Sequence, residues 1–86
     1  MPKILFVCHG NICRSPMGEY ILKDMAGKAG RDGEFEIDSA AVSREEIGNP
    51  VYTPARRELE RHGIPCGGHR ARQVTPADYR HFDRIY

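Results

Sequence analysis

The distribution of apolar and polar residues predicts three short strands separated by helical segments. Lys3–Val7 is a short apolar run rich in residues that favour strands, so we expect a buried strand there. Phe35–Ala41 is a second run of the same kind. Because a helical pattern separates the two runs, their strands should lie parallel. A third strand is expected within Phe82–Tyr86.

Three segments between these runs carry helix signals. In the first, Ser15 is a predicted N-cap residue and Pro16 follows at the first helical position. Apolar residues at four-residue spacing predict the buried face of this helix: Met17, Ile21, Met25 and Ala29. The cap-then-proline pattern recurs at Thr53, and Thr75–Asp78 has the cap residue and acidic third position of another helical turn. The pattern predicts a three-layer α/β sandwich around a parallel sheet.

Composition and charge narrow the functional class. The chain has 86 residues, of which 40% are hydrophobic and 29% charged, an ordinary balance for a folded soluble domain. A formal net charge of +1 without an extended basic block argues against a nucleic-acid partner. No run approaches the ~20 apolar residues of a membrane span, and no secretory signal is evident. Three cysteines do not suggest a disulfide framework, so we expect a reducing, cytoplasmic setting.

The segment from Cys8 to Ser15 carries the chemistry. Cys8 and Arg14 are separated by five residues, directly after the first strand and directly before the first helix. A loop that closes onto a helix N-terminus points several N–H groups into one concavity, which binds phosphate and stabilises a thiolate. Arg14 can bridge two phosphate oxygens, and Ser15 can donate a hydrogen bond to the sulfur. Gly10 allows close backbone approach. We expect a nucleophilic Cys8 in a phosphate-binding loop.

The string C-H-G-N-I-C-R-S-P, residues 8–16, closely resembles the N-terminal signature of the low-molecular-weight protein tyrosine phosphatases. The resemblance continues through four further segments: Asp38–Ala41, Ile47–Pro50, His62–Ile64 and His69–Gln73. It covers essentially the whole chain, but only a little over half of a family domain. Residues 1–86 are therefore expected to be the N-terminal part of a single phosphatase domain, truncated as the third strand begins.

The resemblance implies a hydrolysis in two steps that needs no metal or other cofactor. Cys8 attacks phosphorus to form a cysteinyl phosphate, Arg14 binds the transferring group, and water then releases inorganic phosphate. The expected substrate is a phosphotyrosine protein or peptide, with no nucleic acid or membrane as partner. Asn11, Ser39 and His69 match family positions that hold the loop in shape.

The remaining expected site residues also follow from the resemblance. The phosphate-binding loop comprises His9, Gly10, Asn11, Ile12 and Cys13. Cys13 matches a second cysteine that in the family can form a reversible disulfide with the nucleophile. The expected substrate pocket wall comprises Ile12, Glu45 and Asn49, and Ile12 favours phosphotyrosine over phosphoarginine. Glu45 departs from the aromatic residue that many members have at that position.

A second departure concerns the general acid. In the family this is an aspartate in a D-P loop near the C-terminus, whereas Asp78 and Asp83 lie in a different segment. Loss of general acid assistance typically costs ~10²–10⁴-fold in rate. The 86-residue chain alone is therefore expected to be weakly active or inactive.

Three alternatives remain open from the sequence. A thioredoxin-coupled arsenate reductase resembles this fold and uses the same loop. A non-catalytic module would bind phosphate through the loop without turnover. A structural zinc site would use Cys8, Cys13, Cys66 and His69, although the spacing of the first two is irregular for zinc.

Overall fold

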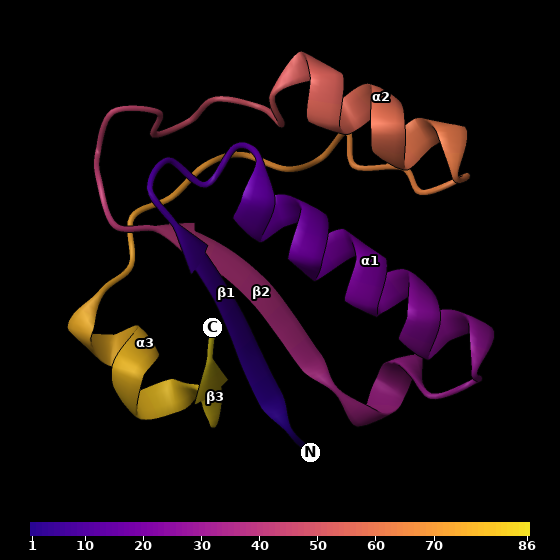
Figure 1. Ribbon diagram of the computed structural model, residues 1–86. Helices are drawn as coiled ribbons and strands as arrows, with labels where there is room; N and C mark the ends of the chain where they lie inside the picture. Colours follow the sequence, from indigo (N-terminus) through magenta and orange to yellow (C-terminus); the bar gives the residue numbers. More distant parts are fainter.

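A parallel sheet of three strands forms the middle layer of the fold. The computed structural model describes residues 1–86, and its strands are β1 (Lys3–Cys8), β2 (Glu36–Ala41) and β3 (Arg84–Ile85). The strand order is β2-β1-β3, with both neighbours parallel to β1 (Figure 1). The three predicted strands are confirmed, with the third reduced to two residues.

Helices cover both faces of the sheet. Helix α1 (Arg14–Lys28) packs on β1 and β2, and α2 (Thr53–Arg61) packs beside α1. Between these helices lies an apolar cluster: Val51, Ala55, Leu59, Ile64 and Cys66. The opposite face carries the short helix α3 (Pro76–His81) and the cluster of Leu5, Ala40 and Phe82. A 3₁₀ turn, η1 (Asp32–Glu34), precedes β2. None of these helices is long and apolar enough to cross a bilayer.

The two crossovers that leave β1 and β2 run on opposite faces of the sheet, so β1 lies at the switch point of the topology. Cys8 pairs in register with Ala41, so β1 and β2 end at the same level. From β1 the chain reaches β2 through α1, and it reaches β3 through α3 on the other face (Figure 1). Parallel sheets bind ligands at such a switch point, outside the carboxyl ends of the strands.

Two predicted helix starts are wrong by one or two residues. Helix α1 begins at Arg14 with Cys13 as its N-cap, so Ser15 lies inside the helix and caps nothing. Its hydroxyl is committed to Cys8 and Asn11 instead. Helix α2 begins at Thr53 itself, without a side-chain cap. By contrast, α3 has the full capping box predicted for Thr75–Asp78.

The predicted buried face of α1 is also wrong. Ile21 and Met25 are 39% and 60% exposed, whereas the buried residues of this helix are Ser15, Pro16, Glu19 and Ala26. Only Met17 of the predicted set packs against the cluster between α1 and α2. The face toward the sheet carries polar residues because their hydrogen bonds are made inside the fold, which removes the usual cost of burying them.

Candidate active site

The loop of residues 9–13 joins the end of β1 to the start of α1. Neighbouring segments hold it on both sides: the backbone N–H of Val42 donates to the Cys8 carbonyl at 2.9 Å, and that of Tyr52 donates to the Ile12 carbonyl at 2.7 Å. The loop therefore lies at the N-terminus of a 15-residue helix, where unpaired N–H groups and the helix dipole favour an anion.

The sulfur of Cys8 lies at the centre of this loop. It is 3.0 Å from the Oγ of Ser15 and 3.3 Å from the backbone nitrogen of Asn11, which donates to it. Burial by itself would raise the pKa of the Cys8 thiol. Hydrogen bonds from the Ser15 hydroxyl and from backbone N–H groups of Ser15, Asn11 and Gly10 outweigh that effect, so the pKa lies below its ordinary value. The thiolate is thus favoured at the position expected for a nucleophile.

Asn11 holds the loop in its conformation. It is fully buried and has a positive φ of 59°, a left-handed conformation that asparagine tolerates better than most residues. Its Nδ2 amide donates to Ser15 Oγ at 2.8 Å and to Ser39 Oγ at 2.9 Å. Its backbone carbonyl accepts from Nε2 of His69 at 2.7 Å. The structure therefore brings together Asn11, Ser39 and His69, the three residues predicted to support the loop.

Glu19 is a member of this network that sequence reasoning missed. It is only 4% exposed, and its Oε1 accepts a hydrogen bond from Ser39 Oγ at 2.5 Å. Its Oε2 accepts from Lys23 Nζ at 2.6 Å, and Nδ1 of His69 lies 4.0 Å from its Oε1. In the sequence, Glu19 and Lys23 look like an ordinary surface pair four residues apart on a helix. The available signal was the spacing of four residues from Ser15, which places both side chains on one face of α1.

His9 of the predicted phosphate-binding loop and two residues of the predicted pocket wall, Glu45 and Asn49, form pairs with glutamate or histidine side chains. His9 Nε2 and Glu45 Oε2 are 2.7 Å apart, and both side chains are exposed. Asn49 Nδ2 donates to Glu46 Oε2 at 2.5 Å. Glu46 also packs against Gly10, where an added Cβ would come within 3.2 Å of its Cγ. The loop after β2 thus lies against the loop of residues 9–13.

Arg14, the predicted phosphate ligand, is the first residue of α1 and is exposed. Cys13 is half-buried beside the cluster between α1 and α2, which contains Cys66. Burial raises the pKa of the Cys66 thiol, the opposite direction from Cys8. The four ligands of the zinc alternative do not converge, since no group of three or more metal-binding side chains is found.

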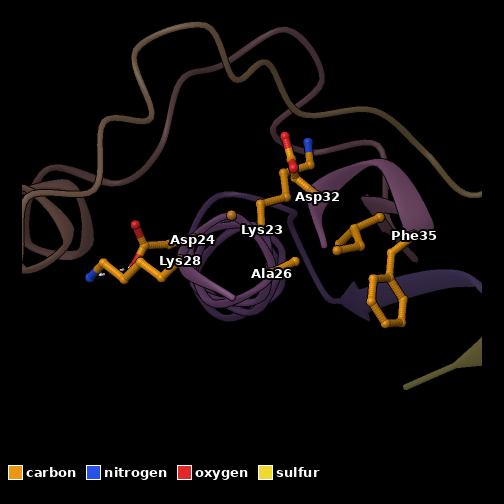
Figure 2. A pocket seen from close by; sticks show the side chains of 8 residues that line it. Lys23, Asp24, Ala26, Lys28, Asp32 and Phe35 are labelled. Atoms are coloured by element: carbon orange, nitrogen blue, oxygen red, sulfur yellow. Dashed lines mark ion pairs between the residues drawn. The ribbon is translucent and has the colours of Figure 1, made fainter. Parts of the chain in front are cut away.

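The larger of two surface cavities, about 560 Å³, lies away from this loop. Its lining comes from the C-terminal half of α1, from η1 and from the start of β2, and includes Lys23, Ala26, Asp32 and Phe35 (Figure 2). None of the residues from Cys8 to Ser15 lines it. The volume of this cavity therefore does not identify the candidate active site. The hydrogen bonds to the sulfur of Cys8 do identify it.

The Cys8 thiol has a lowered pKa and contacts a backbone N–H group at the N-terminus of α1, a helix whose first residue is Arg14. This arrangement is typical of a phosphate-binding loop with a cysteine nucleophile. The sequence profile of the family described as low molecular weight phosphotyrosine protein phosphatase matches residues 3–86. The chain belongs to this family.

Individual relatives agree with this assignment. The Bacillus subtilis low molecular weight protein-tyrosine-phosphatase YfkJ is 47% identical over 85 residues, covering 99% of this chain and 54% of that protein. Its crystal structure superimposes with a TM-score of 0.96. The human low molecular weight phosphotyrosine protein phosphatase is 44% identical over 82 residues, 95% of this chain and 51% of that protein. The Drosophila arginine phosphatase DARP is 35% identical, with a TM-score of 0.90 and 96% and 52% of the two chains covered. The chain spans about half the length of the relatives it matches.

Proposed function

We propose that this chain supplies the nucleophile and phosphate-binding loop of a phosphotyrosine phosphatase. The observation that carries the proposal is the contact of Cys8 Sγ with Ser15 Oγ at 3.0 Å. Ser15 Oγ accepts a hydrogen bond from Asn11 Nδ2, so the hydroxyl proton of Ser15 is free to point at the sulfur and stabilise the thiolate. Membership of the family supports the same conclusion.

The proposed reaction has two displacements at phosphorus. The Cys8 thiolate forms an S–P bond while the P–O bond to the tyrosine oxygen breaks, and the phenolate takes a proton. Water then attacks phosphorus, the S–P bond breaks and the thiolate leaves, stabilised again by Ser15. Arg14 and the loop N–H groups bind the phosphoryl oxygens, most strongly as charge spreads over them in the transition state.

The proton for the leaving phenolate is a separate requirement. The 86 residues contain no Asp-Pro dipeptide of the kind that the family uses as general acid. Asp78 is bound by Arg72 on the other face of the sheet and does not reach Cys8. We therefore expect the chain alone to turn over only substrates whose leaving group needs no proton.

The substrate pocket is proposed to be walled by Ile12, Glu45 and Asn49. Phosphotyrosine in a protein or peptide is the proposed substrate and inorganic phosphate the product. Phosphoarginine is the competing substrate to test, since the structure resembles DARP as well. A reducing, cytoplasmic setting suits a reaction that needs Cys8 as a free thiolate.

The test is Cys8-dependent phosphate release from p-nitrophenyl phosphate, whose phenolate leaves without protonation. Wild type, Cys8→Ser and Cys66→Ala are compared, the last removing a thiol outside the loop. Rapid acid quenching and mass spectrometry should find one phosphoryl group on Cys8 of wild type. Turnover lost in Cys8→Ser and kept in Cys66→Ala is the expected result. Phosphate binding without a phosphocysteine would favour the binding module, and thiol-dependent arsenate turnover would favour the reductase.

A further inference from the structure

The side-chain oxygen of Asn11 has one hydrogen-bond donor, and it comes from a segment far along the chain. The backbone N–H of Arg72 donates to Asn11 Oδ1 at 3.1 Å. This bond fixes which way the Asn11 amide points: with Oδ1 toward Arg72, Nδ2 faces Ser15 and Ser39. The orientation of the Ser15 hydroxyl at the sulfur therefore depends on where the backbone of Arg72 lies.

The side chain of Arg72 anchors that backbone. Its guanidinium makes two hydrogen bonds to Asp78, at 2.9 and 3.1 Å, and one to Asp38 Oδ2 at 3.1 Å. Asp78 belongs to the capping box of α3, and Asp38 lies in β2 directly before Ser39. One arginine therefore ties the segment after His69 to a helix and a strand at once. The hydrogen bonds from Arg72 also hold the pKa of the Asp78 carboxyl below its ordinary value.

The backbone of this segment is fixed to the sheet as well. The N–H of Ala41 donates to the Arg72 carbonyl at 2.7 Å, and the N–H of Val74 donates to the Ala41 carbonyl at 2.8 Å. Ala41 is the residue in register with Cys8. In Figure 1 this stretch, just before α3, passes the carboxyl ends of β1 and β2. Arg72 is thus placed to transmit the position of α3 to the loop.

We propose that Arg72 is a positioning residue for the Cys8 loop. It touches neither the sulfur nor the phosphate site and acts through Asn11, by keeping the Asn11 amide aimed at Ser15 and Ser39. The expected effect of Arg72 on phosphate-ester turnover rests on the proposed phosphatase function. Its expected effect on the pH at which Cys8 ionises does not.

The test measures the pH dependence of Cys8 alkylation by iodoacetamide, with the modified cysteine located by peptide fragmentation. Arg72→Ala should move the alkylation profile of Cys8 to higher pH, and Asp78→Asn should move it less in the same direction. Arg70→Ala is the matched control, because Arg70 is exposed and bonds only to the nearby carbonyls of Gly67 and His69. It should leave the profile unchanged.

Turnover of p-nitrophenyl phosphate supplies a second readout. Displacement of catalytic groups by about 1 Å can cost ~10²-fold, so kcat of Arg72→Ala should fall about tenfold or more with a smaller change in KM. If Arg72→Ala lowers only the unfolding temperature and leaves the Cys8 profile unchanged in the folded protein, the residue is merely structural and the proposal is wrong. If Arg72→Ala does not fold, Asp38→Asn and Asp78→Asn provide the test. A Cys8 alkylation profile that matches wild type in both of these variants would also overturn the proposal. A shifted Cys8 alkylation profile in Arg72→Ala, with no turnover of p-nitrophenyl phosphate by wild type or any variant, would have two meanings. It would support the positioning role of Arg72 and refute the phosphatase function.

Discussion

The Nδ2 amide of Asn11 donates to the Oγ of Ser15 at 2.8 Å, and this contact decides what Ser15 can do. A hydroxyl that accepts from an amide keeps one proton to donate elsewhere, and the sulfur of Cys8 is 3.0 Å away. The left-handed backbone of Asn11 brings its own N–H to the same sulfur. One buried asparagine therefore directs two donors at the sulfur of Cys8, the proposed nucleophile.

The first prediction concerns this hydroxyl. Ser15→Ala removes a hydrogen bond to a charged group, typically about 1.5–3 kcal/mol, so Cys8-dependent turnover should fall roughly 10–100-fold. The pKa of Cys8 should rise, because the Ser15 hydroxyl is the largest of the effects that lower it. Alkylation against pH and kcat of p-nitrophenyl phosphate hydrolysis measure both results.

Ser43→Ala is the control for that experiment. Ser43 Oγ accepts only from the nearby N–H of Glu45, at 3.4 Å, and has no contact with the sulfur. An equal loss in both variants would show that Ser15 has no special role at Cys8.

The second prediction concerns Glu19, whose buried carboxylate accepts from Ser39 Oγ at 2.5 Å and from Lys23 at 2.6 Å. Glu19→Gln places an amide in that site. If the amide NH₂ group of Gln faces Ser39, it meets the Ser39 hydroxyl that donates to Glu19 in wild type, so two donors oppose each other. If it faces Lys23, it meets the ammonium group, which is also a donor. A buried group left without its partner costs about 1–3 kcal/mol, so the free energy of unfolding should fall by that amount in urea titrations.

Asp24→Asn is the matched control on the same helix. Asp24 also pairs with a lysine four residues later, Lys28 at 2.9 Å, but its side chain is 25% exposed and its partner lies at the surface. Surface pairs of this kind contribute about 0.3–0.5 kcal/mol. A loss in Asp24→Asn as large as that in Glu19→Gln would mean that Glu19 acts only as a helix-surface charge.

The sequence predicted those features of the fold and of the candidate site that depend on residues close together in the chain. The strand, the phosphate loop and the helix are consecutive in the chain, so the position of Cys8 at a helix N-terminus follows from residues 3–28 alone. The β1–β2 pairing was also predictable, because an intervening helix requires a parallel crossover. Likewise, the capping box of α3 depends on residues three positions apart.

The roles of Glu19 and Arg72 could not be predicted from the sequence, because they depend on contacts between segments that are distant in the chain. Glu19 sits on a helix face that looks polar, and only the approach of Ser39 from β2 makes that face a buried one. Arg72 looks like one member of a basic cluster until Asp38 and Asp78 are brought to it from two other elements. In both cases a hydrogen-bond partner comes from β2, Ser39 for Glu19 and Asp38 for Arg72, and no local pattern predicts it.

The third prediction concerns acid stability. Hydrogen bonds from Arg72 hold the pKa of Asp78 below its ordinary value of 3.8, so ionised Asp78 stabilises the folded state. That contribution is fully present above the unfolded pKa and is lost as pH falls through the lower, folded value. Wild type should therefore be more stable than Asp78→Asn at neutral pH, and the difference should shrink once the pH falls below 3.8.

Urea unfolding of both proteins between neutral pH and the acid range measures this difference. The other carboxylates are common to both proteins and cancel in the comparison. A difference that stays constant through the acid range would mean that Asp78 acts by its shape and not by its charge.

The fourth prediction uses two glycines at the end of α1. Gly27 lies inside the helix and Gly30 follows it with a φ of +71°; an added Cβ would meet no atom within 4 Å at either position. Gly30 ends the helix in a Schellman motif, in which Arg31 N–H donates to the Ala26 carbonyl at 2.7 Å. The two sites therefore differ in backbone conformation and not in the space around them.

Gly27→Ala should raise the free energy of unfolding by about 0.5–1 kcal/mol, because glycine in a helix interior has more freedom to lose on folding. Gly30→Ala should lower it by about 1–2 kcal/mol, because a side chain disfavours the left-handed conformation. Urea titrations of the two variants measure both changes, and Cys8 alkylation should match wild type in each. If Gly27→Ala destabilises the protein as much as Gly30→Ala does, Gly27 does not lie in a helix interior and the prediction is wrong.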